Sequence, residues 1–176
     1  MELATFASGC FWCTEAFFQR LKGVYNVKSG YTGGHVKSPT YREICSGLTM
    51  HTEGIQFEYD PSVIAYSELL EVFWKMHDPT TLNRQGNDVG TQYRSAIFYH
   101  TQEQKEEAIK YRDDLNRAAI WDSQIVTEIA PVDVFYEAEI YHKDYYNSNK
   151  SQPYCSYIIN PKMAEFKRVF KDKLAD

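Results

Sequence analysis

The sequence predicts an α+β protein in which strands and helices pack as an α/β sandwich. Short runs that are apolar, or that alternate apolar and polar residues, are typical of strands, and they are interleaved with amphipathic runs typical of helices. The connections are short, and no repeat, low-complexity tract or linker divides the chain. A length of 176 residues suits one domain with a sizeable core, so residues 1–176 are expected to form a single domain.

The amino-acid composition argues against nucleic acid and membranes as binding partners of this protein. Hydrophobic residues make up 43% of the chain and charged residues 24%, which is ordinary for a soluble globular protein. A net charge of -5 without a basic stripe argues against nucleic acid. No apolar run approaches a membrane span, and the N-terminus lacks a signal-peptide layout. We therefore expect a cytoplasmic monomer that does not bind membranes, in which four cysteines serve catalysis or metal binding rather than a disulfide framework.

The N-terminal stretch contains the most informative motif. Residues 3–7 read as a short strand, Ser8-Gly9 as a turn, and residues 16–21 as part of a helix, which puts Cys10 at or just before the first helical turn. Backbone N–H groups there lack partners and the helix dipole is positive, so a thiolate is favoured and the pKa of Cys10 should be low. Because Phe11 and Trp12 place apolar surface beside it, the sulfur is expected to attack a small apolar group.

Cys10 and Cys13 form a C-x-x-C pair, which has several interpretations. Such a pair can be redox-active or nucleophilic, can supply half of a zinc site, or can be buried as small apolar side chains. A closed structural zinc site needs four ligands, and the other two cysteines, Cys45 and Cys155, are isolated. The sequence therefore predicts no metal site.

The later elements follow in order along the chain. Strands are expected at residues 24–31, 52–59, 95–99 and 125–129, the last stopped by Pro131. Helices are expected at 38–44, 67–77, 102–119 and 139–147, and a terminal helix carries the stripe Met163, Phe166, Phe170 and Leu174. Residues 78–92 are polar and without period. Because loops this long are uncommon and often functional, this one could deliver Asp88 and Tyr93 to a site at a sheet edge.

The strand at 52–59 places a carboxyl group on its apolar face. Ile55, Phe57 and Tyr59 share one side of the strand, and by the same alternation His51 and Glu53 point to that side. Burying a charged carboxylate is expensive. Glu53 could lie at a solvated strand end and pair with an arginine, or it could be a neutral acid with a raised pKa that donates a proton. Alternation alone leaves both readings open.

At this point the chain resembles the A-type peptide methionine sulfoxide reductases over nearly its whole length. The segments that carry the resemblance agree in order and spacing. They are Gly9-Cys10-Phe11-Trp12 with Glu15, Gly30-Tyr31 with Gly33-Gly34, Pro39-Thr40-Tyr41, Cys45-Ser46-Gly47, His51-Thr52-Glu53, residues 77–81, residues 88–95, and Tyr141-His142 with Asp144-Tyr145. The resemblance implies a single catalytic domain, a two-layer sandwich with a mixed sheet, and a ferredoxin-like core.

The resemblance also implies a reaction. Family members of this type reduce the S epimer of methionine sulfoxide, free or in proteins, and each epimer needs its own enzyme. Cys10 matches the nucleophile, which becomes a sulfenic acid and then a disulfide that an external dithiol such as thioredoxin reduces. No metal or bound cofactor is required. The other matching residues are Phe11 and Trp12, which hold the substrate methyl group, Glu53, Tyr41 and Tyr93, which hydrogen-bond the sulfoxide oxygen, and Asp88, which supports them.

The resolving thiol is where the chain departs from many family members. They have glycine at the position of Cys13 and resolve with a cysteine near the C-terminus. Cys155, in a loop-like region that could swing over the site, is favoured over Cys13, and a relay through both stays open. Cys45, at the end of a short helix, is expected to be a buried structural thiol.

Two other functions compete with sulfoxide reduction. A thiol–disulfide oxidoreductase would use Cys10 and Cys13 on protein substrates, and its activity would not depend on Glu53. A non-catalytic module would hold methionine-containing peptides in its aromatic cleft, and its binding would not depend on Cys10.

Overall fold

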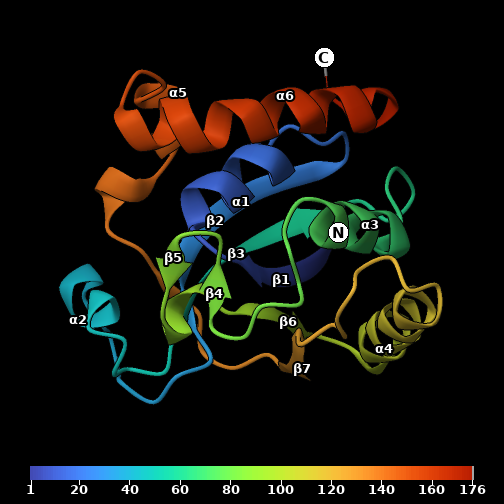
Figure 1. Ribbon diagram of the computed structural model, residues 1–176, viewed down its shortest axis with the longest axis horizontal. Coiled ribbons are helices and arrows are strands. Elements are labelled where there is room, and N and C mark those ends of the chain that lie inside the picture. Colours follow the sequence, from blue (N-terminus) through green and yellow to red (C-terminus); the bar gives the residue numbers. More distant parts are fainter. Residues whose placement is uncertain (176) are drawn as a thin grey trace.

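A six-stranded sheet with the order β7-β6-β1-β3-β2-β8 forms the centre of the molecule (Figure 1). This computed structural model describes residues 1–175, and Asp176, the last residue of the predicted domain 1–176, lies outside the described residues. The strands are β1 (Glu2–Ser8), β2 (Val24–Thr32), β3 (Thr52–Tyr59), β6 (Ser95–Tyr99), β7 (Glu128–Pro131) and β8 (Tyr136–Glu137). Strands β4 (Arg84–Gln85) and β5 (Asp88–Val89) form a separate hairpin.

Within the four central strands, in the order β6-β1-β3-β2, each adjacent pair is antiparallel. Helix α1 (Phe11–Phe18) connects β1 to β2, and helix α3 (Tyr66–Lys75) lies between β3 and β6 in the chain. This is the topology of a ferredoxin-like core. Because β7 pairs in parallel with β6, the sheet is mixed, and the predicted α+β fold class is confirmed.

One aromatic residue shows which helices share a face of the sheet. The ring of Phe6 in β1 lies 5.5 Å from that of Phe18 in α1 and 5.1 Å from that of Phe73 in α3. Helix α6 (Asn160–Val169) then covers α1, with Phe166 stacked on Phe17 (Figure 1). The remaining helices are α2 (Tyr41–Cys45), α4 (Gln102–Arg117) and α5 (Tyr145–Ser148). The C-terminal helix α6 thus packs against the end of α1.

Several predicted boundaries were wrong. Strand β7 covers 128–131 rather than 125–129, and it includes Pro131 because an edge strand tolerates a residue without an N–H. Residues 139–147 do not form one helix. They form a 3₁₀ turn (Ile140–His142) and the start of α5, separated by Asp144 in a left-handed conformation with φ 51°.

The polar stretch 78–92 contains the β4–β5 hairpin and part of a 3₁₀ turn, Thr91–Tyr93. The terminal helix ends at Val169, and Leu174 pairs with Leu21 beyond it. Among residues 1–175, none of the helices combines the length and the apolar character that a bilayer crossing requires.

Gly9 makes the corner between β1 and α1. Its φ of 99° lies in the region that disfavours L side chains, and a Cβ there would come within 2.8 Å of the Gln85 side chain in the β4–β5 hairpin. The corner therefore depends on glycine for both conformation and space. It also sets the position of the residue that follows, Cys10.

Substitution of Gly9 by Ala should lower the free energy of unfolding by about 2–4 kcal/mol, through backbone strain and contact with Gln85. Gly86→Ala is the matched control, because Gly86 also has a positive φ, of 58°, but has nothing within 4 Å of the added Cβ. Urea unfolding of both variants should give a larger loss for Gly9→Ala. Equal losses would contradict a steric role for Gly9.

Candidate active site

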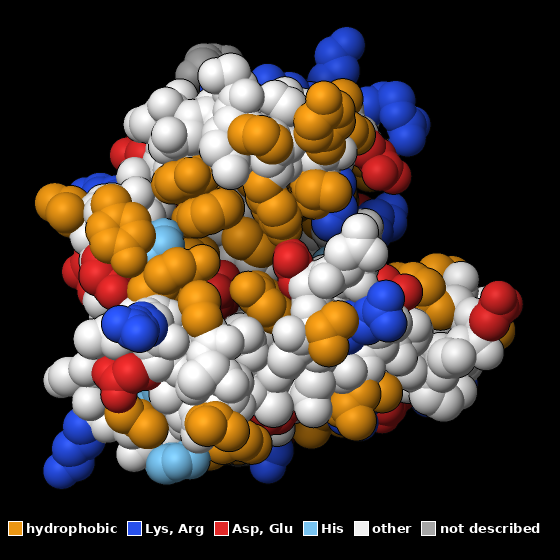
Figure 2. Space-filling view, turned by 60° about the vertical axis from the view of Figure 1, so that its left-hand side comes forward, with side chains coloured by type: hydrophobic (Ala, Val, Ile, Leu, Met, Phe, Trp, Pro, Cys, Tyr) orange, Lys and Arg blue, Asp and Glu red, His pale blue; other side chains and the backbone are white. Residues whose placement is uncertain are grey.

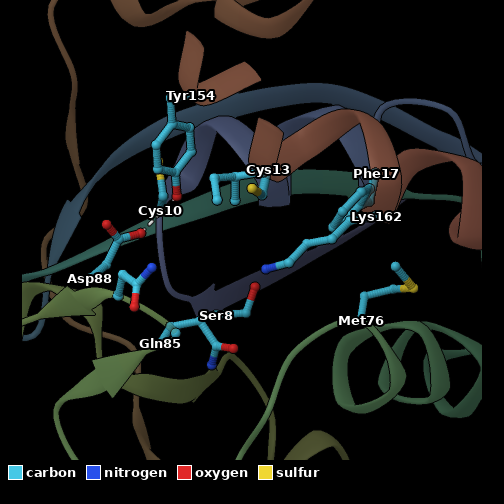
Figure 3. A pocket seen from close by; sticks show the side chains of 12 residues that line it. Ser8, Cys10, Cys13, Phe17, Met76, Gln85, Asp88, Tyr154 and Lys162 are labelled. Carbon is cyan, nitrogen blue, oxygen red and sulfur yellow. Dashed lines mark hydrogen bonds between the residues drawn. The ribbon is translucent and has the colours of Figure 1, made fainter. Parts of the chain in front are cut away.

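Cys10 is the residue just before the first turn of α1, as the sequence predicts. Its carbonyl oxygen accepts the N–H of Cys13 at 3.2 Å, which sets the two cysteines one helical turn apart. Both line a cavity of about 180 Å³ between α1, the β4–β5 hairpin and α6 (Figure 3). The Cys10 side chain is half-buried, so a small substrate can reach it.

The expected low pKa of Cys10 was wrong for the resting site. Burial raises the pKa of this thiol well above its ordinary value, and the charge of Glu53 raises it further. A hydrogen bond from the backbone of Trp12 acts in the opposite direction and is outweighed. The helix start therefore supplies the favourable N–H group, but desolvation dominates. The resting sulfur is a thiol at neutral pH.

Glu53 occupies the covered face of β3, with 2% of its surface exposed. Its Oε1 accepts the backbone N–H of Phe11 at 3.2 Å, so the carboxyl group lies at the N-terminus of α1 beside Cys10. Burial raises the pKa of Glu53 to about 8 even though the Phe11 N–H favours the carboxylate. The reading of a solvated carboxylate paired with arginine was wrong, and Glu53 is a neutral acid at pH 7.

Two phenols lie within electrostatic range of that acid. Burial raises the pKa of Tyr41, at the start of α2, and of Tyr93, in the 3₁₀ turn, and the charge of Glu53 raises both further. Both hydroxyls therefore keep their protons at neutral pH and can donate hydrogen bonds. The Asp88 carboxylate does not hydrogen-bond these groups, and it accepts a hydrogen bond from the hydroxyl of Tyr154 at 2.7 Å instead.

The two aromatics after Cys10 differ in their exposure. Phe11 is 1% exposed, whereas Trp12 is partly exposed. The Tyr145 ring stacks on the Trp12 ring, with 3.8 Å between the ring centroids. The indole Nε1–H donates to Nδ1 of His142 at 3.0 Å, which fixes the ring plane. Figure 2 shows hydrophobic side chains gathered on the side of the molecule that carries α2, the β4–β5 hairpin and α5.

The remaining thiols differ from expectation. Cys155 does not lie in a loop, since it begins a π-helical turn (Cys155–Ile159) and is 0% exposed. Cys45 is exposed rather than buried, because α2 is a short surface helix whose buried residue is Ile44. Cys13 is buried in the wall of the cavity. All four cysteines are free thiols.

Within residues 1–175, which the structure describes, no three His, Cys, Asp or Glu side chains lie close enough together to hold a metal ion. The chemistry of the site is that of a thiol, a neutral carboxylic acid and phenols.

A sequence model of the family described as peptide methionine sulfoxide reductase matches residues 2–174. The chain belongs to this family.

Individual relatives agree with the family model. The chain is 52% identical to the peptide methionine sulfoxide reductase MsrA of Saccharolobus solfataricus, over 99% of this chain and 97% of that protein, and 55% identical to that of Sulfolobus acidocaldarius, over 98% and 97%.

Among solved structures, reduced Mxr1 of Saccharomyces cerevisiae is 37% identical, with a TM-score of 0.77 over 84% of this chain and 85% of that one. Methionine sulfoxide reductase A of Corynebacterium diphtheriae is 38% identical, with a TM-score of 0.75 over 84% and 74%. Mxr1 in complex with Trx2 is 30% identical, with a TM-score of 0.56 over 82% and 84%.

Sequence reasoning missed four residues of this site in a peptide methionine sulfoxide reductase. Tyr154 contacts the edge of Trp12 and hydrogen-bonds Asp88, while His142 and Tyr145 hold the Trp12 ring. Lys162 lines the cavity from α6. The segment Tyr141-His142 with Asp144-Tyr145 was a usable signal for His142 and Tyr145. Nothing local marked Tyr154 or Lys162 among the many tyrosines and lysines.

The raised pKa of Glu53 predicts how stability depends on pH. The folded state keeps a proton that the unfolded chain releases above about pH 4.5, so this contribution to stability is complete below pH 4.5 and is lost as pH rises through about 8. Glu53→Gln should remove a loss of up to about 1.4 kcal/mol per pH unit between these two pH values, where the unfolded chain has released the proton and the folded state still keeps it. Urea unfolding at several pH values measures it.

Glu15 provides a matched control, because it is also buried and its pKa is raised, to about 7. Glu15→Gln should reduce the pH dependence of the free energy of unfolding below pH 7 but leave it unchanged between pH 7 and 8. Glu53→Gln should abolish the dependence between pH 7 and 8. Identical slopes for wild type and Glu53→Gln between pH 7 and 8 would show that Glu53 is charged in the folded protein.

Proposed function

We propose that this chain reduces the S epimer of methionine sulfoxide, free or in proteins, at Cys10. Membership of the family makes it an oxidoreductase that reduces methionine sulfoxide in peptides. The observation that carries the assignment of the site is the contact of Glu53 with the Phe11 N–H, which puts a neutral acid beside the Cys10 thiol. An apolar wall at Trp12 and oxygen-binding donors around Glu53 would distinguish the three substituents of a chiral sulfur.

The first step follows from the polarity of the sulfoxide. Its oxygen carries negative charge that grows as Cys10 attacks the sulfur, and donors from Tyr41, Tyr93 and protonated Glu53 stabilise that charge. Glu53 gives its proton to the oxygen, and the proton of the Cys10 thiol replaces it. The bond between oxygen and the substrate sulfur breaks, the hydroxyl group ends on Cys10 as a sulfenic acid, and the thioether methionine leaves.

The sulfenic acid is resolved through a relay in this proposal. Cys13 shares the cavity with Cys10 and lies one helical turn away, which supports it as the first resolving thiol. Cys155 lies within electrostatic range of Cys13 and would exchange with it next. Thioredoxin then reduces the enzyme by dithiol exchange, an assignment supported by the solved complex of Mxr1 with Trx2.

The setting of the enzyme belongs to the same proposal. Catalysis by free thiols suits the reducing cytoplasm, and all four cysteines are free. The net charge of -5 favours neither nucleic acid nor an acidic membrane surface as a partner. We assign it as a monomer without metal or bound cofactor.

Glu53→Gln should slow methionine formation by a factor of about 10²–10⁴, because the amide donates a hydrogen bond but no proton. Wild-type activity should fall as pH rises through about 8, where Glu53 loses its proton. The variant should not show this fall in activity. Single-turnover release of methionine across pH 6–9 measures both effects. A thiol–disulfide oxidoreductase would keep full dithiol exchange in Glu53→Gln, and a peptide-binding module would bind equally in Cys10→Ser and show no turnover.

Disulfide mapping by mass spectrometry after one equivalent of substrate should identify the relay. Cys155→Ser should stop at a bridge between Cys10 and Cys13, whereas wild type should pass it on to a bridge between Cys13 and Cys155. Cys13→Ser should retain the Cys10 sulfenic acid. Cys45→Ser, at an exposed position, is the control and should match wild type. A bridge from Cys10 to Cys155 that forms in Cys13→Ser at the wild-type rate would overturn the order of the relay.

A further inference from the structure

The cavity beside Cys10 contains a cation that the reaction as described does not use. Lys162 lies in the first turn of α6 and lines the cavity together with Cys10 and Cys13. Figure 3 shows its side chain reaching from α6 across the cavity toward Ser8. Its surface is partly buried, whereas Lys167 on the same helix is exposed.

No carboxylate among residues 1–175 forms an ion pair with the ammonium group of Lys162. Among residues 1–175, the ion pairs of the structure involve other lysines and arginines. Asp88 also lines the cavity, but its carboxylate accepts the hydroxyl of Tyr154. Because Phe17, Met76 and Ile158 form apolar parts of the wall, the charge of Lys162 is less screened than at the surface.

Cys13 is the group in this cavity that needs a positive charge. A thiol attacks only as a thiolate, and burial raises the pKa of Cys13 to about 12. Asp88 and Cys155 add to this rise, while Lys162 and the nearby Tyr154 hydroxyl oppose it, and Lys162 has the larger effect of the two. The neighbouring Cys10 is itself a thiol before turnover and a neutral sulfenic acid after it.

We propose that Lys162 is a positioning residue that stabilises the Cys13 thiolate while Cys13 resolves the Cys10 sulfenic acid. The inference rests on the proposed role of Cys13 as the first resolving thiol. In this step a bond forms between the sulfurs of Cys13 and Cys10, and the S–O bond of the sulfenic acid breaks. The hydroxide leaves with the proton of Cys13 as water, so no further reactant is needed.

The experiment follows bridge formation in the Cys155→Ser protein, where Cys13 is the resolving candidate that remains in the cavity. Methionine release and loss of the sulfenic acid, trapped with dimedone, are timed in a single turnover between pH 6 and 9. Lys162→Met should slow bridge formation about tenfold at each pH between 6 and 9, because removal of a nearby cation raises the pKa of Cys13 by about one unit, and below that pKa each unit lowers the thiolate fraction tenfold.

Two further variants separate charge from packing. Lys162→Arg keeps the charge and should restore most of the rate, whereas Lys162→Gln, which is polar and uncharged, should behave like Lys162→Met. Lys167→Met removes an exposed lysine from the same helix and should match the parent protein. Thermal unfolding of each variant establishes that the comparison is made between folded proteins.

The outcomes distinguish the inference from the relay beneath it. If the bridge forms and Lys162→Met and Lys162→Gln show the parent rate across this pH range, the inference is overturned and the relay stands. If the Cys155→Ser protein with Lys162 intact forms no bridge between Cys10 and Cys13, the relay itself is overturned, and the inference with it.

Discussion

The contact between the Glu53 carboxyl group and the Phe11 N–H is the interaction on which the site depends. It joins the middle of the sheet to the first turn of α1, so the acid and the thiol of Cys10 keep a fixed relation. The helix N-terminus favours a carboxylate, and burial favours the neutral acid. Burial prevails, because the pKa of Glu53 rises to about 8. The fold thereby holds a proton donor at a place where an ion would otherwise be expected.

The same burial determines the state of the nucleophile. A charged Glu53 would raise the pKa of Cys10, so a neutral Glu53 is the form that allows a thiolate to develop beside it. In the proposed reaction, a group that accepts the proton of Glu53 leaves a carboxylate that takes the proton of the Cys10 thiol, so activation of Cys10 is tied to the arrival of that group. A sulfoxide oxygen is such a group, and water in the resting site is a poor substitute because the developing charge needs preorganised donors. This coupling explains how a thiol with a high pKa can still be a selective nucleophile.

Features that depend on neighbouring residues in the chain could be predicted from the sequence. The alternation of β3 placed Glu53 on the covered side, and the turn before Cys10 placed that residue at a helix start. The resemblance to a family supplied Tyr41, Tyr93 and the ferredoxin-like core. Features that depend on long-range packing could not be predicted. The pKa of Cys10, the π-helical turn at Cys155 and the entry of Lys162 into the cavity all depend on where α6 and its preceding segment lie.

The position of Cys155 constrains how reducing equivalents reach the site. Cys155 is 0% exposed and Cys13 is 6% exposed, so an external dithiol cannot attack a bridge between them in the described conformation. Tyr154 holds this segment through its hydrogen bond to Asp88 and its edge contact with Trp12. Exchange therefore requires the segment that begins at Tyr154 to open locally, which costs less than global unfolding because few groups must separate. Because the π-helical turn begins at Cys155, this turn must rearrange when the segment opens.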